Sequence, residues 1–347
     1  MPKPLAALTA FVALSWSACA HAQDTAAPSP DPTYFDYVST DAAATLRDGR
    51  RIQVVCMGEG SPTVILTAGL GDWGVAWRKV QRPLAEHTRV CTWDRPGIGF
   101  SDASPVTQNP RTTTDDLEAA LAATGIEGPY VMVGHSFGAY ESMTFADRHP
   151  DQVVGFVSVD GSFPNQMARF REASPAIGEA NDRRLAAQAA LSQRCIADLQ
   201  AGRIFVGSPD PDGCLEYPTD YPAEISATLA RLDSDWKRIA TQASLADHRP
   251  QTMVAMVDPA RDYGDMPLIV LTANTVSASA TEAVIANWPQ RAAVWMQGHD
   301  EVAALSSRGV NRLVPDSGHY IQYDWPDIVI AAILEVVETA RARATGQ

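Results

Sequence analysis

Short apolar segments alternate along the chain with longer amphipathic segments, and this alternation predicts the secondary structure. The apolar segments are strand-length and end in turn residues, as in "PYVMVGHS", whereas the amphipathic segments are long enough for helices. Strands and helices that alternate in this way are typical of a mostly parallel sheet with helices on both faces. We expect strands near 51–57, 63–68, 88–93, 129–134, 153–159, 267–272 and 310–315, and helices near 74–86, 112–124, 137–148, 281–305 and 326–343.

The alternation is interrupted between residues 162 and 263. There "NQMARFREASPAIGEANDRRLAAQAALSQRCIADL" and "AEISATLARLDSDWKRIATQASLA" predict helices, with no strand between them apart from the ambiguous "RIFVG". The alternation resumes at "MPLIVLTAN". We therefore expect an α/β core formed by 23–161 and 264–347, with 162–263 inserted as a helical cap over the end of the sheet.

The first 22 residues have the pattern of a secretory signal peptide. Lys3 precedes an apolar run from Leu5 to Ala18, and Ala20 and Ala22 are the small residues expected before a cleavage point. Cleavage is predicted after Ala22. No later stretch is apolar for long enough to span a bilayer. The mature protein is therefore expected to be secreted or periplasmic, without stable membrane insertion.

Four cysteines remain after the predicted leader, and their positions favour one pattern of disulfides. An even number of cysteines in a chain sent to an oxidising compartment indicates paired thiols. Cys56 and Cys91 lie in strand-like segments, whereas Cys195 and Cys214 bracket a segment rich in Gly, Pro and Asp. We favour the pairing of Cys56 with Cys91 and of Cys195 with Cys214.

The formal net charge of −14 argues against partners that bind through basic patches. Nucleic acids and anionic membrane surfaces attract clusters of Lys and Arg, and the sequence contains none. It also lacks H-E-x-x-H, paired C-x-x-C, clustered histidines and a phosphate-binding glycine loop after a strand. We expect no nucleic-acid partner, no metal and no cofactor.

The segment "YVMVGHSFGAYESM" places Ser136 between two glycines, where an apolar strand passes into a helix. G-x-S-x-G alone is a common sequence, but strand, sharp turn and helix in this order are typical of a nucleophile elbow. Gly134 and Gly138 lack the side chains that would keep strand and helix apart. Ser136 is therefore predicted to be a nucleophile. The N–H of Phe137, at the start of the helix, is expected to face the anion formed by its attack.

A serine nucleophile needs a base that a third group orients, and His319 is the best candidate for that base. It lies in "PDSGHYIQYDWPD", between the last expected strand and the last helix. Loops at this end of parallel strands hold the active sites of open α/β sheets. His135 adjoins the serine and is expected to shape the site. Histidines expected at the surface are His87, His149, His248 and His299.

Four motifs together resemble those of the α/β-hydrolase family. They are "TAGLGDWGVAW", "DRPGIGFSD" after an expected strand, "GHSFG" and the terminal "SGHY", in that order. The resemblance covers the chain from about residue 50 to its end. It implies that Ser136 is the nucleophile, that His319 is the general base, and that the backbone N–H groups of Leu70 and Phe137 form the oxyanion hole. "WDRPG" matches a structural turn of the family.

The acid of the implied triad has two possible positions. Family members often carry it after the strand that follows the cap, but here Asn274 or Val276 occupies that place. The end of the preceding strand, "VVGFVSVDGS", offers Asp160, on the sheet edge that holds Ser136. An Asp followed by Gly is also an ordinary turn signal. We predict Asp160 as the acid and rank three other carboxylates below it, namely Asp265, Asp300 and Glu301.

These residues predict a secreted serine hydrolase that cleaves a carboxylic ester through an acyl-enzyme. A small, apolar ester is expected if the side chains of the cap line the pocket, although the same spacing fits the cap's own core. The same triad can act on an amide, lactone, thioester or carbon–carbon bond. The alternative of another class is a non-catalytic binding protein: the absence of a carboxylate after "VLTAN" favours it, but Ser136, Asp160 and His319 in the family's order argue against it. The oligomeric state does not follow from the sequence. The apolar cap residues in question are Phe163, Met167, Phe170, Ile225, Leu229, Trp236 and Ile239.

Overall fold

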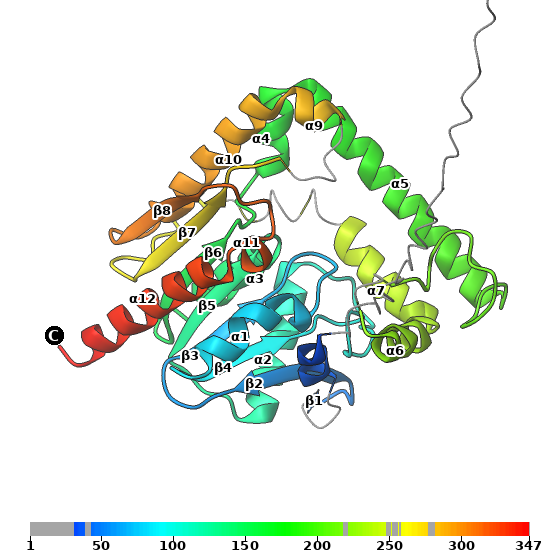
Figure 1. The fold of residues 1–347 in the computed structure, drawn as a ribbon, viewed down its shortest axis with the longest axis horizontal. Coiled ribbons are helices and arrows are strands. Elements are labelled where there is room, and N and C mark those ends of the chain that lie inside the picture. Colours follow the sequence, from blue (N-terminus) through cyan, green and yellow to red (C-terminus); the bar gives the residue numbers. More distant parts are fainter. Residues whose placement is uncertain are drawn as a thin grey trace, which may run out of the picture.

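The computed structural model describes most of the chain outside its N-terminal segment (Figure 1). The predicted signal peptide and His248 lie outside the described residues. In the part that is described, no helix is both long enough and apolar enough to cross a membrane. The described residues are 31–38, 43–217, 221–247, 251, 256, 258–276 and 282–346.

An 8-stranded sheet forms the centre of the structure, in the order β1-β2-β4-β3-β5-β6-β7-β8. β2 is antiparallel to its neighbours β1 and β4, and all the other pairs are parallel. The mostly parallel sheet predicted from the alternating pattern is confirmed. The strands are β1 Ala43–Thr45, β2 Arg51–Met57, β3 Thr63–Thr67, β4 Val90–Trp93, β5 Tyr130–His135, β6 Val153–Val159, β7 Leu268–Ala273 and β8 Gly309–Val314.

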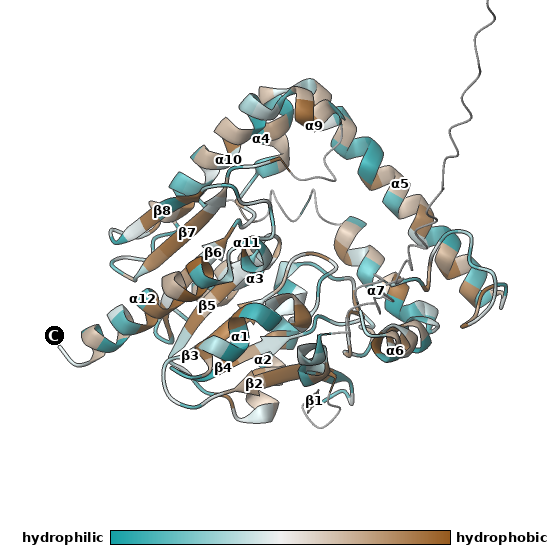
Figure 2. Cartoon of the chain, viewed as in Figure 1, coloured by the Kyte–Doolittle hydropathy of each residue, from teal (hydrophilic) through white to brown (hydrophobic). Residues whose placement is uncertain are grey.

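Helices cover both faces of the sheet, so its central strands are buried on both sides. α1 (Arg78–Leu84) and α12 (Pro326–Ala344) pack on one face, with Val64 and Leu66 of β3 beneath them. α2 (Pro110–Thr124), α3 (Gly138–Arg148) and α10 (Trp288–Ala303) pack on the other face, over Ile65. Successive residues of a strand point to opposite faces, which explains why these strands read as continuous apolar runs. Figure 2 shows the central strands as hydrophobic along their length.

Some element boundaries differ from the prediction. The helix expected near 112–124 begins at Pro110, because the side chain of Asn109 caps it. Gly125 ends this helix in the left-handed conformation. The helix expected near 281–305 is two helices, α9 (Glu282–Ala286) and α10, because a proline after Trp288 fits only a first helical turn. Three short elements were not expected, namely β1, the 3-10 helix Pro32–Tyr37 and α11 (Ile321–Asp324).

Four helices of the described residues lie between β6 and β7 in the chain, and we call them the helical insertion. They are α4 (Gln166–Ala173), α5 (Pro175–Gln200), α6 (Ala223–Asp233) and α7 (Trp236–Asp247). In Figure 1, α5 runs along one side of the molecule from α4 to the region of α6 and α7. The ambiguous "RIFVG" forms no strand. This part of the chain is helical, as its sequence pattern predicts.

Two disulfides join the cysteine pairs that the sequence favours. Cys56 and Cys91 lie directly opposite each other on the antiparallel strands β2 and β4. Cys195, near the end of α5, is joined to Cys214 in the segment that follows that helix. The first bridge therefore links two strands of the core, and the second closes a loop within the helical insertion.

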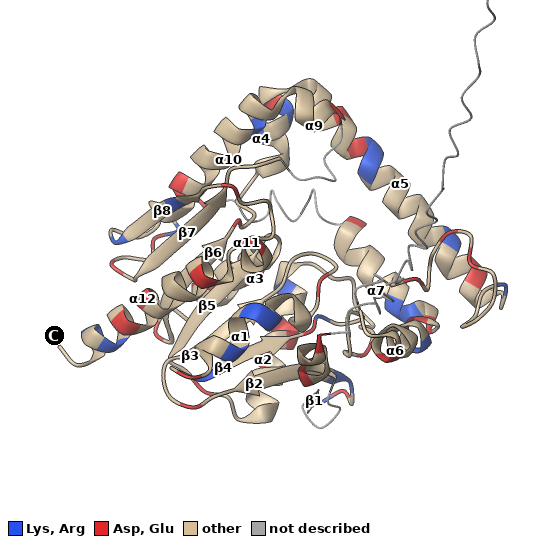
Figure 3. Cartoon of the chain, viewed as in Figure 1, with Lys and Arg blue, Asp and Glu red and all other residues tan. Residues whose placement is uncertain are grey.

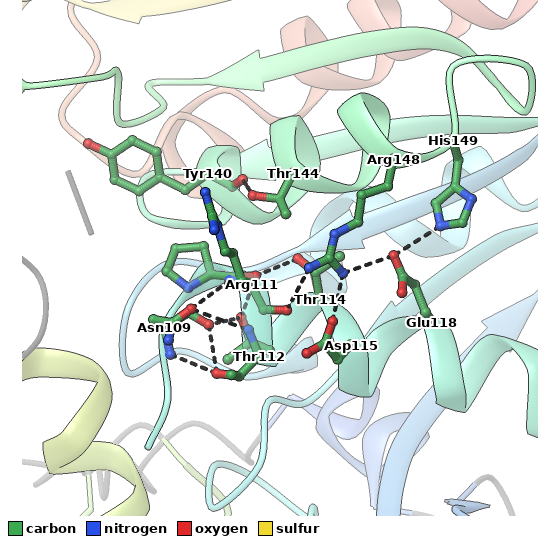
Figure 4. A network of polar contacts seen from close by, with 12 residues as sticks. Asn109, Arg111, Thr112, Thr114, Asp115, Glu118, Tyr140, Thr144, Arg148 and His149 are labelled. Carbon is green, nitrogen blue, oxygen red and sulfur yellow. Dashed lines mark hydrogen bonds and ion pairs between the residues drawn. The ribbon is translucent and has the colours of Figure 1, made fainter. Parts of the chain in front are cut away.

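Polar contacts tie α2 to α3, the helix that follows Ser136 (Figure 4). Arg148 donates hydrogen bonds to Asp115 at 2.8 Å and to Glu118 at 3.1 Å. His149 lies 2.9 Å from the same Glu118 carboxylate. Figure 3 shows acidic and basic residues mixed along α5 and α12. The network fixes the position of α3 from the solvent side, while its opposite face packs against the sheet.

Candidate active site

Ser136 lies at the sharp turn between β5 and α3, with a backbone φ of 51°. This left-handed conformation is uncommon for a residue other than glycine and occurs at functional sites. A Cβ at Gly134 would lie 2.6 Å from the backbone of Ala139, and one at Gly138 would lie 2.5 Å from the carbonyl oxygen of Thr67. Both glycines are therefore needed for strand and helix to pass this closely, as the motif predicts.

The structure brings Ser136, His319 and Asp160 into one hydrogen-bonded chain. The Nε2 atom of His319 lies 2.9 Å from the Oγ atom of Ser136, and its Nδ1 atom lies 2.6 Å from an Asp160 carboxylate oxygen. Ser136 follows β5, Asp160 follows the adjacent β6, and His319 lies in the loop after β8. Because all three strands are parallel, their C-terminal ends meet at one edge of the sheet. The three residues are therefore adjacent although about 180 positions separate the first from the last.

Asp160 is held as a buried carboxylate. Its Oδ1 atom accepts hydrogen bonds from the N–H of Ala273 at 2.9 Å and from the indole Nε1 of Trp295 at 2.7 Å, which leaves Oδ2 for His319. Burial by itself would raise the pKa of Asp160, but the hydrogen bond and charge of His319 bring that pKa below its ordinary value. β7 thus supplies a backbone donor, not a carboxylate, to the site.

The three carboxylates ranked below Asp160 as the acid interact with other residues. Asp300 accepts a hydrogen bond from Asn311, and Glu301 pairs with Arg169 at 2.6 Å. Asp265 pairs with Arg343. Of the four candidate acids, Asp160 alone contacts His319 among the interactions of the described residues.

The residues predicted for the oxyanion hole line the cavity that contains Ser136. Leu70 and Phe137 line the same cavity as the serine, and neither N–H donates a backbone hydrogen bond within the described chain. Buried Arg95 fixes the loop that carries Leu70, because its guanidinium donates to the carbonyl oxygens of Ala68 and Gly69. The loop geometry is thereby set before any substrate binds.

Arg95 is a positioning residue that sequence reasoning left out of the chemistry. Its guanidinium forms two hydrogen bonds with the carboxylate of Glu141 on α3, and both side chains are buried. The pair therefore connects the loop of Leu70 to the helix that follows Ser136. The motif "WDRPG" drew attention to this turn, but nothing in the sequence indicates that Glu141 would contact Arg95.

His135 and His299 are both fully buried. The expectation that His299 lies at the surface is wrong, because α10 turns it toward the sheet, where its Nε2–H donates to the Gly161 carbonyl at 2.8 Å. His135 donates from Nε2 to the backbone carbonyl of His319 at 3.0 Å. Burial lowers the pKa of His135 to about 3 and also lowers the pKa of His299. His135 is therefore neutral and supports the His319 loop.

A cavity of about 560 Å³ opens at this edge of the sheet. Of the apolar insertion residues expected to wall a pocket, Met167, Phe170 and Ile239 line it. Phe163 instead packs in the core against Trp295. Two others, Ile225 and Leu229, belong to a separate apolar cluster, and Trp236 is not among the lining residues. The described residues contain no group of three or more His, Cys, Asp or Glu side chains that could hold a metal ion.

The strand order, the strained serine turn and the Ser-His-Asp geometry are those of the α/β-hydrolase fold. Residues 62–204 match the family described as "alpha/beta hydrolase fold". An esterase from Thermogutta terrifontis covers 86% of this chain and is itself covered to 98%, with a TM-score of 0.54 and 19% identity. A Pseudomonas aeruginosa protein described as a candidate epoxide hydrolase gives a TM-score of 0.60 at 19% identity, with 86% and 96% covered. The chain therefore has the α/β-hydrolase fold.

Related sequences include both hydrolases and uncharacterized proteins. RutD of Caulobacter sp. (strain K31), whose name proposes a carbamate hydrolase, is 32% identical over 177 residues, which cover 50% of this chain and 56% of RutD. The uncharacterized protein YqjL of Bacillus subtilis is 23% identical over 279 residues, covering 80% and 85%. An uncharacterized Schizosaccharomyces pombe protein is 46% identical over 77 residues, or 22% of this chain, and the match spans only 14% of that relative. Of these three relatives, RutD has a name that supports a hydrolase.

Proposed function

We propose that this protein is a serine hydrolase that cleaves carboxylic esters through an acyl-enzyme intermediate. The observation that carries this proposal is the chain of hydrogen bonds from Ser136 through His319 to buried Asp160, at the wall of a cavity. A serine becomes a useful nucleophile only with such an oriented base. The relatives named as hydrolases support the same general class.

In this mechanism, His319 removes the proton of Ser136 while the serine oxygen attacks the ester carbonyl. Asp160 keeps the Nδ1 proton in place and stabilises the imidazolium that forms. The N–H groups of Leu70 and Phe137 hold the negative oxygen of the tetrahedral intermediate, a contribution of about 3 to 4 kcal/mol per donor in such sites. His319 then gives its proton to the leaving alcohol, and a water molecule activated by the same imidazole releases the acid.

A carbamate is the second candidate substrate class. The name proposed for RutD favours it, and a carbamate carbonyl can be attacked by the same serine. Epoxide opening is disfavoured despite the Pseudomonas aeruginosa neighbour, because that reaction in this fold uses a carboxylate nucleophile and position 136 is serine. The remaining alternatives are an amide, lactone, thioester or carbon–carbon bond.

We make two further proposals, one on the role of the helical insertion and one on the location of the protein. Residues 162–263 act as a cap over a core formed by 23–161 and 264–347, which is supported by the lining residues that α4, α5 and α7 contribute to the cavity. The signal-peptide pattern of residues 1–22 and the two disulfides support a secreted or periplasmic location.

A fluorophosphonate probe tests the central claim, because it phosphonylates only an activated serine and releases fluoride. We expect one adduct, on the peptide that carries Ser136, together with turnover of 4-nitrophenyl butyrate. Ser136→Ala is the control and should abolish both. An unlabelled Ser136 in folded protein would refute the hydrolase proposal and favour a binding protein on this fold.

A further inference from the structure

The wall of the cavity that contains Ser136 also carries two guanidinium groups. Arg291 lies in the first turns of α10, and Arg184 lies on α5 of the helical insertion, and both line the same cavity as Ser136. No carboxylate of a described residue lies within ion-pair distance of either one, whereas many other arginines of the described chain are paired in this way. Two unpaired cations that share one cavity indicate an anionic partner from outside the chain.

Arg291 is held in place by aromatic side chains. Its guanidinium carbon lies 4.4 Å from the ring centre of Phe170 and 4.9 Å from that of Trp295. Cation–π contacts of this kind fix the orientation of the guanidinium and leave its N–H donors free to bind another group. Burial lowers the pKa of Arg291, and the nearby charge of Arg184 acts in the same direction, while Asp160 opposes both. A bound anion would relieve this unfavourable environment.

Trp295 also places Arg291 relative to the reacting atoms. The same indole donates to Asp160 at 2.7 Å, and its ring centre lies 6.2 Å from that of His319. Arg291 and His319 thus both lie next to the side chain of Trp295. An anionic group on Arg291 would therefore belong to the same small molecule whose carbonyl faces Ser136.

The charges of the cavity favour an anion with a single charge. Its lining carries two arginines, Arg184 and Arg291, and two aspartates, Asp72 and Asp160, at the end near the serine. Burial raises the pKa of Asp72 above its ordinary value. A phosphate monoester would bring nearly two charges close to Asp160, whereas a carboxylate brings one and matches the planar fork of a guanidinium.

We propose that Arg291, assisted by Arg184, binds a carboxylate carried by the substrate, so that the preferred esters are acidic molecules with an apolar body. This inference rests on the proposed ester hydrolysis and adds the substrate class to it. It also modifies the expectation of a purely apolar ester, because Phe170 and Met167 provide the apolar wall and Arg291 provides a charged end.

Two matched pairs of esters test the proposal. The first pair is 4-nitrophenyl hydrogen adipate and its methyl ester, in which the charge is on the acyl side. The second pair is the butyrate ester of 4-hydroxyphenylacetic acid and of the methyl ester of that acid, in which the charge is on the leaving group. In Arg291→Gln we expect KM for the acidic member of one pair to rise about tenfold or more, while its kcat changes little. KM and kcat for the neutral member should also change little. Arg291→Lys should restore part of the affinity.

Arg169→Gln is the matched control, because Arg169 also contacts an aromatic ring, Phe163 at 5.2 Å, but pairs with Glu301 and does not line the cavity. It should leave the preference for acidic esters intact. The proposal is overturned if Arg291→Gln changes the acidic and neutral members of both pairs equally, or changes neither. The pair that responds identifies the side of the ester that carries the carboxylate.

Binding without turnover separates this inference from the proposed activity. In Ser136→Ala, calorimetry with monomethyl adipate, which carries one charge, should show binding, and the added Arg291→Gln change should remove it. Inorganic phosphate should bind more weakly than monomethyl adipate. If the wild-type protein hydrolyses no ester but this binding pattern holds, the ester activity fails and the carboxylate site stands. If neutral esters are cleaved and monomethyl adipate does not bind, only the carboxylate site fails.

Discussion

Replacing Asp160 with asparagine removes the charge of this side chain. The surrounding hydrogen bonds determine the orientation of the asparagine amide. Oδ1 of Asp160 accepts from two fixed donors, the N–H of Ala273 and the indole of Trp295. The oxygen of an asparagine therefore takes this position, and its NH₂ group faces Nδ1 of His319. Nδ1 must then accept a hydrogen bond, so the imidazole proton moves to Nε2. In that tautomer His319 cannot accept the proton of Ser136.

The size of the effect follows from the geometry. Two opposite charges about 4 Å apart interact by about 4 kcal/mol at an effective dielectric constant of 20, so the loss of the Asp160 charge alone lowers the rate by about 10³-fold. The wrong tautomer adds to this, and we expect kcat for 4-nitrophenyl butyrate to fall by about 10³- to 10⁴-fold. The free energy of unfolding should change by less than about 2 kcal/mol, because the donors around position 160 keep their acceptor.

The assay is a comparison of kcat and of urea unfolding for the wild type and Asp160→Asn. Asp300→Asn and Glu301→Gln serve as controls, and both should keep rates near that of the wild type because their carboxylates contact Asn311 and Arg169. The reasoning is refuted if folded Asp160→Asn retains a rate within about tenfold of the wild type. A large loss in Asp300→Asn would instead identify a different acid.

Two other predictions concern stability. Glu141→Gln leaves Arg95 as a buried, uncompensated charge and should cost about 3 kcal/mol in urea unfolding, whereas Glu335→Gln breaks an exposed pair and should cost less than about 1 kcal/mol. His135 titrates with a pKa of about 3 in the fold and near 6.5 when unfolded, so the unfolded chain binds the extra proton. The wild type should therefore lose stability as pH falls from about 6.5 toward 3, by up to about 1.4 kcal/mol per pH unit from this residue. His135→Gln, which can still donate to the His319 carbonyl, should show a shallower loss in the same titration.

Each of these predictions has a clear contrary result. Equal losses for Glu141→Gln and Glu335→Gln would show that burial of the Arg95 pair has no special importance. For His135, parallel pH profiles of the wild type and the variant would show that its protonation is not linked to unfolding. Activity at pH 7 provides a further control, since the glutamine should leave the His319 loop in place.

Local sequence patterns were sufficient to predict the fold and part of the candidate site. The period of apolar residues determines which faces of a strand or helix are buried, and this does not depend on distant parts of the chain. The turn at Ser136 could be predicted because Gly134, the serine and Gly138 are all needed within one short segment. His319 could be selected because its loop follows the last parallel strand, and chain order alone places that loop at the active edge.

Tertiary structure decided which distant side chains meet. Asp160 is distinguished from other carboxylates by the donors that reach it from Ala273 and Trp295, which lie 113 and 135 positions away in the chain. The burial of His299 depends on how α10 packs over the sheet, and so does the position of Arg291, which has no ion pair with a described residue. Local periodicity shows which residues face inward, but it does not show what they will face. The sequence by itself therefore determined the α/β fold, the serine turn and the histidine loop, while only the packing of β6, β7 and α10 decided the acid and the charge of the cavity.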